Sequence, residues 1–130
     1  MSILDAAQIE VRGVVVKGDG RGRGLGFPTA NLALKNSPPV REGIYAAWAT
    51  LDSDPAPRRA VIHAGPRPSF PGASPSFEVH VLDFPDRDLY GSTLTCTDLV
   101  YIRGIKNFSS VEELKTAIAH DCQQARRLLV

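Results

Sequence analysis

The sequence predicts a mostly β fold: a small antiparallel β-barrel that carries one α-helix at its C-terminal end. Two patterns support this class. Short apolar segments alternate with clusters of Gly, Pro, Ser and Asp, and one segment near the C-terminus has helical periodicity. The predicted strands cover residues 9–17, 43–51, 58–63, 77–84 and 94–102. Strands at such spacing are typical of small barrels, and 130 residues suit a single domain over residues 1–130.

The predicted helix covers about residues 110–128. A capping box begins it, in which the Ser110 side chain accepts from the backbone of Glu113 and the Glu113 side chain reaches back. Apolar residues then recur at helical spacing: Val111, Leu114, Ile118, Cys122, Ala125 and Leu129. Arg126 and Arg127 lie near the carbonyl end, where positive charge is favourable. We expect this helix to pack on the barrel and to carry no catalytic residue.

Charge and composition exclude several classes of protein. Fifteen basic and fourteen acidic residues give a net charge of +1, so we expect binding neither to nucleic acid nor to a membrane surface. No apolar run approaches the roughly 18 residues of a membrane span, and the N-terminus lacks the pattern of a secretory signal. Cys96 and Cys122 are too few for a disulfide framework, so we expect two reduced, partly buried thiols. These features predict a cytoplasmic protein.

The segment from Gly18 to Asn31 holds the richest motif. Its alternating glycines would let backbone N–H groups approach a polyanion without obstruction by side chains. It is not a Walker A loop, because no Gly-Lys-Ser/Thr follows. The alternative interpretation is a flexible turn rich in Arg and Gly. Residues 18–28 and 65–76 are also long connections for so small a domain, and such loops are often functional.

Thr29 and Asn31 lie two residues apart at the end of this segment. On extended backbone, that spacing directs a hydroxyl and an amide oxygen to the same side. Mg²⁺ takes few protein ligands and completes its shell with water and phosphate oxygens, so the pair is a candidate magnesium site. The alternative is a turn in which both side chains bond to local backbone.

The predicted strand 77–84 has bulky residues on both faces. Alternation separates Phe77, Val79 and Val81 from Glu78, His80, Leu82 and Phe84. A face that combines apolar residues with Glu78 and His80 indicates a strand whose second face lines a site. A solvated edge strand is the alternative.

Six segments, in order and at similar spacing, resemble the motifs of the riboflavin kinase family, as found in the C-terminal half of bacterial bifunctional FAD synthetases. They are GRGLGFPTANL at 22–32, GIYA at 43–46, HAGPRPSF at 63–70, EVHVLDF at 78–84, DLYG at 88–91 and IRGIKNF at 102–108. A similar helix follows, ending in D-x-x-x-A-R, so the resemblance covers about residues 11–128.

This resemblance implies a six-stranded Greek-key barrel with a C-terminal helix. It also implies an enzyme that transfers phosphate from ATP to the ribityl 5′-hydroxyl of riboflavin, giving FMN, with Mg²⁺ as cofactor. By the same resemblance Glu78 is the general base, Thr29 and Asn31 are the metal ligands, and Arg103, Asn107 and Phe108 bind the flavin. The residues implied to bind ATP and its phosphates are Gly20, Gly22, Arg23, Gly24, Gly26, Pro28, Thr29 and Asn31.

The chain departs from the family motifs at five positions. His63 stands where bacterial members usually have Asn, and Ala64 where they have Ile, while Ser69 replaces Thr and keeps its hydroxyl. Gly104 and Ile105 replace the Pro and Glu that follow the arginine of the family's R-P-E segment. Because glycine widens the backbone options of this loop, we expect weaker riboflavin binding that depends on bound nucleotide.

The resemblance also sets expectations about partners and leaves two alternatives open. The 130 residues contain no counterpart of the N-terminal adenylyltransferase domain of bifunctional family members, and from the Met1-Ser2 start we expect a stand-alone kinase and not an excised module. We expect a monomer that binds riboflavin, FMN, ATP and ADP, with a separate FAD synthetase as a conceivable partner. The alternatives are a non-catalytic flavin-binding regulatory module and a kinase for a modified flavin.

Overall fold

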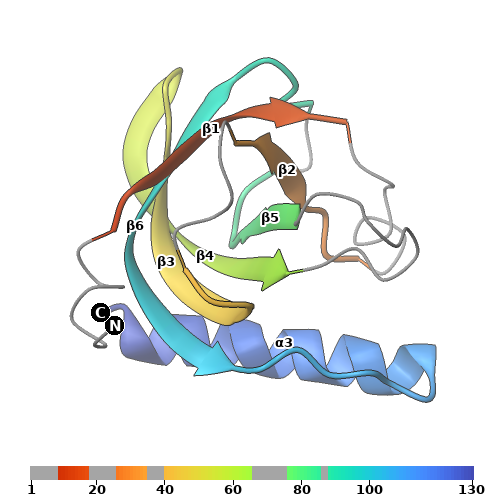
Figure 1. The fold of residues 1–130 in the computed structure, drawn as a ribbon. Helices are drawn as coiled ribbons and strands as arrows, with labels where there is room; N and C mark the ends of the chain where they lie inside the picture. The colour runs from red at the N-terminus through yellow and green to blue at the C-terminus, as the bar shows by residue number, and fades with distance from the viewer. Residues whose placement is uncertain (1–8, 18–25, 35–39, 66–75, 86–87) are drawn as a thin grey trace.

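The computed structural model describes residues 9–17, 26–34, 40–65, 76–85 and 88–130, which form a closed barrel with one helix along its side (Figure 1). The strands are β1 (Val11–Val16), β2 (Ala30–Ala33), β3 (Gly43–Leu51), β4 (Asp54–Gly65), β5 (Ser76–Val81) and β6 (Thr93–Arg103), and the helix is α3 (Val111–Leu128). The predicted barrel with a C-terminal helix is therefore confirmed.

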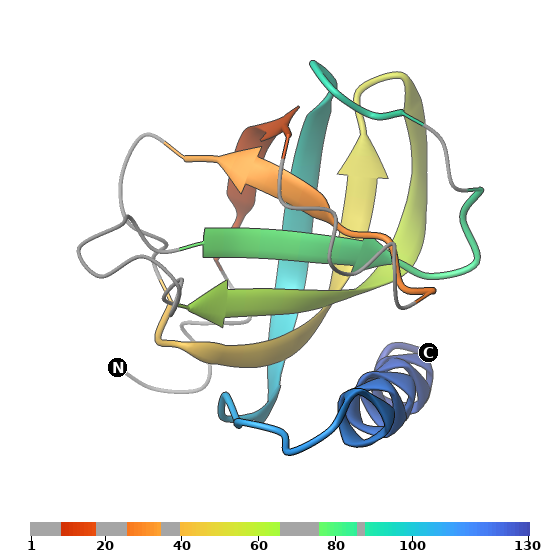
Figure 2. The same ribbon diagram turned by 90° about the vertical axis from the view of Figure 1, so that its right-hand side faces the viewer.

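The six strands follow the order β1-β2-β5-β4-β3-β6 around the barrel, and every pair is antiparallel. The consecutive strands β3, β4 and β5 are neighbours, and β6 returns to lie beside β3, which is the Greek-key arrangement. Figure 2 shows β5 between β2 and β4. This order brings residues 30–33 next to residues 76–81, although more than forty residues separate them in the chain.

The barrel interior is filled by alternate residues of all six strands. Its largest fully buried side chains include Tyr45, Ile62, Phe77, Leu94 and Leu99. β1 shows the alternation most clearly, with Val11, Gly13 and Val15 buried and the residues between them exposed.

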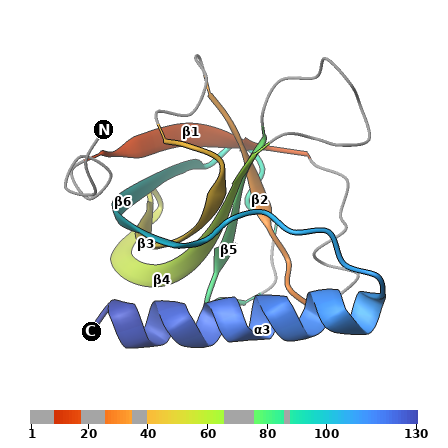
Figure 3. The same cartoon turned by 60° about the horizontal axis from the view of Figure 1, so that its bottom comes forward.

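A second apolar cluster lies between the outside of the barrel and α3. It contains Ile44, Ala46, Val61, Leu82, Cys122, Ala125 and Leu129. Figure 3 shows the helix running along the barrel, where it contacts β3, β4 and β6. β3 is consequently buried on both faces, which is why its sequence GIYAAWATL is apolar throughout and not alternating.

Both ends of α3 are held by polar contacts. Ser110 Oγ accepts from the Glu113 N–H at 3.1 Å, as predicted. The Glu113 carboxylate accepts from the N–H and the hydroxyl of Ser109. In a standard capping box it would accept from the N–H of the N-cap residue, Ser110. At the other end Arg59 Nε donates to the carbonyl oxygen of Leu129, so β4 binds the helix terminus directly.

Several boundaries differ from the sequence prediction. β4 extends beyond the predicted 58–63 in both directions, and β5 stops at Val81, before the predicted end at residue 84. Asp83 has a φ of 54°, so the chain turns sharply there. Val111 was predicted in the apolar stripe but is exposed, since it lies in the first turn of the helix.

The pattern of the sequence did not reveal β2 as a separate strand, because it is only four residues long. The two cysteines are free, as predicted, but they are buried rather than partly buried. In the part of the chain that the structure describes, no helix combines the length and hydrophobicity needed to cross a bilayer.

We predict that neither cysteine reacts with a thiol reagent such as DTNB while the protein is folded. Burial raises the pKa of Cys96 to about 12, and burial is also the main cause of a raised pKa at Cys122. Because the thiolate is the reactive form, labelling should be negligible at pH 8 in native buffer and should reach two thiols per chain in denaturant. Stoichiometric labelling within seconds in native buffer would contradict this burial.

Candidate active site

Three polar side chains form a row across neighbouring strands on the outer face of the barrel. Asn31 of β2 lies opposite Glu78 of β5, and Glu78 lies opposite His63 of β4. Their sequence neighbours Val79 and Ile62 belong to the barrel interior, so the row points outward. The predicted face of β5 that carries Glu78 thus meets the strand that carries Asn31.

The members of this row are partly shielded from solvent. Asn31 is buried, and the Glu78 and His63 side chains are 27% and 37% exposed. His63 Nδ1 lies 3.8 Å from Glu78 Oε2, close enough for an ion pair if the imidazole is protonated but too far for a hydrogen bond. Within the described residues His63 Nδ1 is buried and has no hydrogen-bond partner.

The chain entering β2 is fixed to β5 by His80. The Nδ1–H of this histidine donates to the carbonyl oxygen of Pro28 at 2.7 Å, and Phe27 packs edge-on against its ring with the centroids 5.7 Å apart. Gly26 has a φ of 87°, a conformation that favours glycine. Thr29 follows Pro28 and is exposed directly before β2, so its position depends on this contact.

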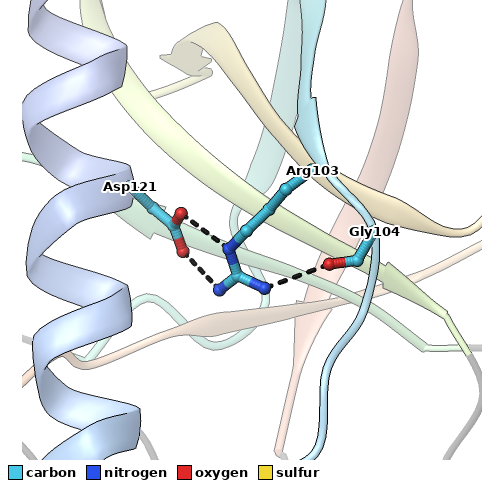
Figure 4. A network of polar contacts seen from close by, with 3 residues as sticks. All are labelled: Arg103, Gly104 and Asp121. Atoms are coloured by element: carbon cyan, nitrogen blue, oxygen red, sulfur yellow. Dashed lines mark hydrogen bonds and ion pairs between the residues drawn. The ribbon is translucent and has the colours of Figure 1, made fainter.

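In a second region, β6 ends in an arginine that is bound to the helix. Arg103 Nε and one terminal nitrogen donate to the two carboxylate oxygens of Asp121 at 2.9 and 2.7 Å, and the other terminal nitrogen donates to the carbonyl oxygen of Gly104 at 3.1 Å (Figure 4). Asp121 is 2% exposed. A bidentate pair fixes both position and orientation of the guanidinium, so it ties the segment after β6 to α3.

A groove of about 610 Å³ lies between that segment and the N-terminal half of the helix. Arg103, Lys106, Phe108, Glu112, Glu113, Thr116, Ala117 and His120 line it. The Arg103 guanidinium lies 5.8 Å from the centre of the Phe108 ring. The groove therefore combines one aromatic surface with charged groups of both signs. The helix was expected to do no more than pack on the barrel, yet five of these eight lining residues belong to it.

The predicted site residues fall into three groups. Asn31, Glu78 and the adjacent Thr29 lie together on the outer face of β2 and β5. Arg103 and Phe108 line the groove beside α3, whereas Asn107 is exposed and is not part of the lining. Gly26 and Pro28 precede β2, and the other predicted phosphate-binding residues, Gly20, Gly22, Arg23 and Gly24, lie outside the described residues.

Sequence reasoning missed two residues that the structure brings to the site. The first is Asp121, which binds Arg103. Its position between Ile118 and Cys122, on the side of the helix that packs on the barrel, is the sequence feature that could have indicated a buried carboxylate. His63 was noted only as a departure from the family motif, and its contact with Glu78 follows from strand register.

A family model described as riboflavin kinase matches residues 6–129. The chain belongs to the riboflavin kinase family. The mouse riboflavin kinase is 37% identical over 91% of this chain and 79% of its own length. The bifunctional riboflavin kinase/FMN adenylyltransferase of Bacillus subtilis is 36% identical over 90% of this chain but only 37% of its own length.

Two solved structures share the fold. The riboflavin kinase of Trypanosoma brucei superposes with a TM-score of 0.73 at 25% identity, over 92% of this chain and 76% of that one. A Streptococcus pneumoniae structure named as a macrolide-efflux protein gives a TM-score of 0.80 at 33% identity, over 92% of this chain and 38% of that one. The shared fold makes up most of the Trypanosoma brucei chain and a smaller part of the Streptococcus pneumoniae chain.

We predict that Asp121→Ala lowers the free energy of unfolding by about 3 kcal/mol, because it leaves the partly buried Arg103 without its partner. Arg126→Ala is the matched control, since it removes the exposed pair with Asp83 and should cost no more than about 1 kcal/mol. Urea unfolding followed by circular dichroism measures both values. Equal losses for the two variants would show that Arg103–Asp121 is no more important than a surface pair.

Proposed function

We propose that this chain transfers the γ-phosphate of ATP to the ribityl 5′-hydroxyl of riboflavin, giving FMN and ADP. Membership of the riboflavin kinase family supports the overall reaction. The observation that carries the detailed proposal is the register that sets Asn31 opposite Glu78, because it brings a neutral oxygen ligand and a carboxylate together on one outward face.

Thr29 and Asn31 are the proposed ligands of Mg²⁺. Their hydroxyl and amide oxygens suit a hard cation that keeps most of its shell for water and phosphate oxygens. The described residues contain no cluster of three or more His, Cys, Asp or Glu side chains that could hold a metal by themselves. When bound, the metal would neutralise charge on the phosphates.

The glycine-rich segment is proposed to hold the phosphates. Gly20, Gly22, Arg23 and Gly24, together with Gly26 and Pro28, precede Thr29 directly in the sequence. Backbone N–H groups in a glycine-rich segment can converge on phosphate oxygens. The contact between His80 and Pro28 supports this assignment, because it fixes the end of the segment relative to Glu78 on the same strand.

Glu78 is the proposed general base. It would take the proton of the ribityl hydroxyl while that oxygen forms a bond to the γ-phosphorus and the bond to the β-phosphate oxygen breaks, releasing ADP. Phosphoryl transfer depends mainly on positioning and charge neutralisation, so a single carboxylate beside the nucleophile completes the set of groups needed.

The groove beside α3 is the proposed flavin site. Phe108 offers an aromatic surface, and Arg103 and Lys106 offer hydrogen-bond donors to the carbonyl oxygens of the ring system. Asn107, which lies between Lys106 and Phe108 in the sequence, is a further proposed donor to the flavin. We further propose that the chain is a monomer and that it associates with a separate FAD synthetase.

An assay with riboflavin, MgATP and chromatographic separation of FMN tests the proposed function. FMN formation that requires both substrates supports it. Riboflavin binding without turnover would instead indicate a regulatory module, and turnover of only a substituted flavin would indicate another substrate. Either result would overturn the proposal.

We predict that Glu78→Gln binds both substrates nearly as the wild type does but loses kcat by about 10²- to 10⁴-fold. Glutamine has almost the same shape and cannot accept the proton, so the loss should appear in kcat and not in KM. The exposed Glu10→Gln is the matched control and should behave as wild type. A near-normal kcat for Glu78→Gln would remove this residue from the base role.

We predict that Thr29→Ala and Asn31→Ala each weaken MgATP binding much more than riboflavin binding. Each variant removes one oxygen ligand, so the difference between ATP affinity with and without Mg²⁺ should shrink. Calorimetry with ATP in the presence and absence of Mg²⁺ measures this difference. If both variants keep the wild-type dependence on Mg²⁺, these two residues only shape the start of β2.

A further inference from the structure

Two positions at which the chain departs from the family motifs meet in space. A Cβ atom placed on Gly65, at the end of β4, would overlap the side chain of Ile105 and would lie 3.6 Å from His63 Cε1. Ile105 and the imidazole of His63 therefore flank the same piece of backbone. The two departures, His for Asn and Ile for Glu, are neighbours although forty-two positions separate them in the sequence.

Nδ1 of the same imidazole, which is bonded to Cε1, faces the proposed base. His63 and Glu78 are cross-strand partners, and His63 Nδ1 lies 3.8 Å from Glu78 Oε2. That nitrogen is buried and makes no hydrogen bond within the described residues. A shift of less than about 1 Å would bring it to hydrogen-bonding distance from the carboxylate.

We propose that His63 is a positioning residue for Glu78, an inference that rests on the proposed kinase function. Its Nδ1–H donates to one carboxylate oxygen of Glu78 in the reactive complex and so fixes the orientation of the carboxylate. The side-chain amide nitrogen of asparagine stands at the same distance along the side chain as Nδ1 of histidine. The histidine thus keeps the donor that the family's usual asparagine would supply.

Ile105 determines which nitrogen of the imidazole carries the proton. Neutral histidine has one N–H, and a hydrogen-bond acceptor beside one nitrogen draws the proton to that side. The side chain of Ile105 adjoins Gly65, beside which His63 Cε1 also lies, and it has no acceptor, so it does not compete with Glu78 for the proton. Cε1 is bonded to both ring nitrogens, and Nδ1 faces Glu78, so the nitrogen left for a carboxylate at position 105 is Nε2. Such a carboxylate would favour the Nε2–H form and leave the lone pair of Nδ1 directed at Glu78. An apolar residue at position 105 is therefore compatible with a histidine at position 63 that donates from Nδ1.

Three substitutions of His63 test the positioning role. His63→Leu removes both nitrogens and should lower kcat by about 10- to 100-fold, the effect of losing a hydrogen bond to a charged group, while KM for MgATP and the thermal midpoint stay close to wild type. His63→Asn restores a donor at the Nδ1 position and should recover most of the lost kcat. His63→Gln carries its nitrogen at the Nε2 position instead and should recover little.

A double-mutant cycle tests the coupling to Ile105. Ile105→Glu in the wild-type background should lower kcat, because the introduced carboxylate attracts the imidazole proton away from Nδ1. In the His63→Asn background the same change should have little effect, since an amide has no alternative tautomer. Nitrogen NMR of the His63 ring supplies a readout that does not depend on turnover, with the Nδ1–H form expected in the wild type and the Nε2–H form in Ile105→Glu.

The outcomes separate this inference from the proposed function. If the wild type makes no FMN, the kinase proposal fails. If the wild type is active but His63→Leu matches it in kcat, or His63→Gln recovers activity as well as His63→Asn does, His63 does not position Glu78. If Ile105→Glu has the same effect in both backgrounds, or leaves the tautomer unchanged, the role of Ile105 is wrong.

Discussion

The register between β2, β5 and β4 is the constraint on which the site depends. Asn31, Glu78 and His63 share an outward row only because they are direct cross-strand partners. A slip of one residue in either pairing would turn one member into the barrel interior, among side chains such as Phe77 and Val79. The buried interior and the closure of the barrel therefore fix the geometry of the proposed active site.

Polar contacts outside the strands then connect this row to its surroundings. His80 holds the chain before Thr29 against β5, two residues from Glu78 on the same face. Asp121 holds Arg103 at the end of β6, where the segment that lines the groove begins. The helix thus has two roles, since it covers the outside of the barrel and also supplies one wall of the groove.

The sequence predicted the barrel class because strand patterning and turn residues agree along most of the chain. Segment 43–51 could be predicted to the residue, since its glycine start and apolar run are unambiguous, whereas β2 is too short to show a period. Residue spacing and strand alternation indicated Thr29, Asn31 and Glu78 as candidates, and the motif resemblance gave them roles and added Arg103. The partners of Glu78 and Arg103 could not be predicted, because His63 and Asp121 are brought there by register and by helix packing, which no local pattern contains.

The central claim is that phosphoryl transfer occurs at the outward row of β2 and β5. Paramagnetic NMR with Mn²⁺ in place of Mg²⁺ tests it most directly, by locating the metal in the protein–ADP complex. The account predicts that backbone signals of Thr29, Asn31 and Glu78 are broadened first as Mn²⁺ is added, and that no such effect occurs without ADP. Broadening centred on another face of the barrel, or equal broadening without nucleotide, would contradict the account.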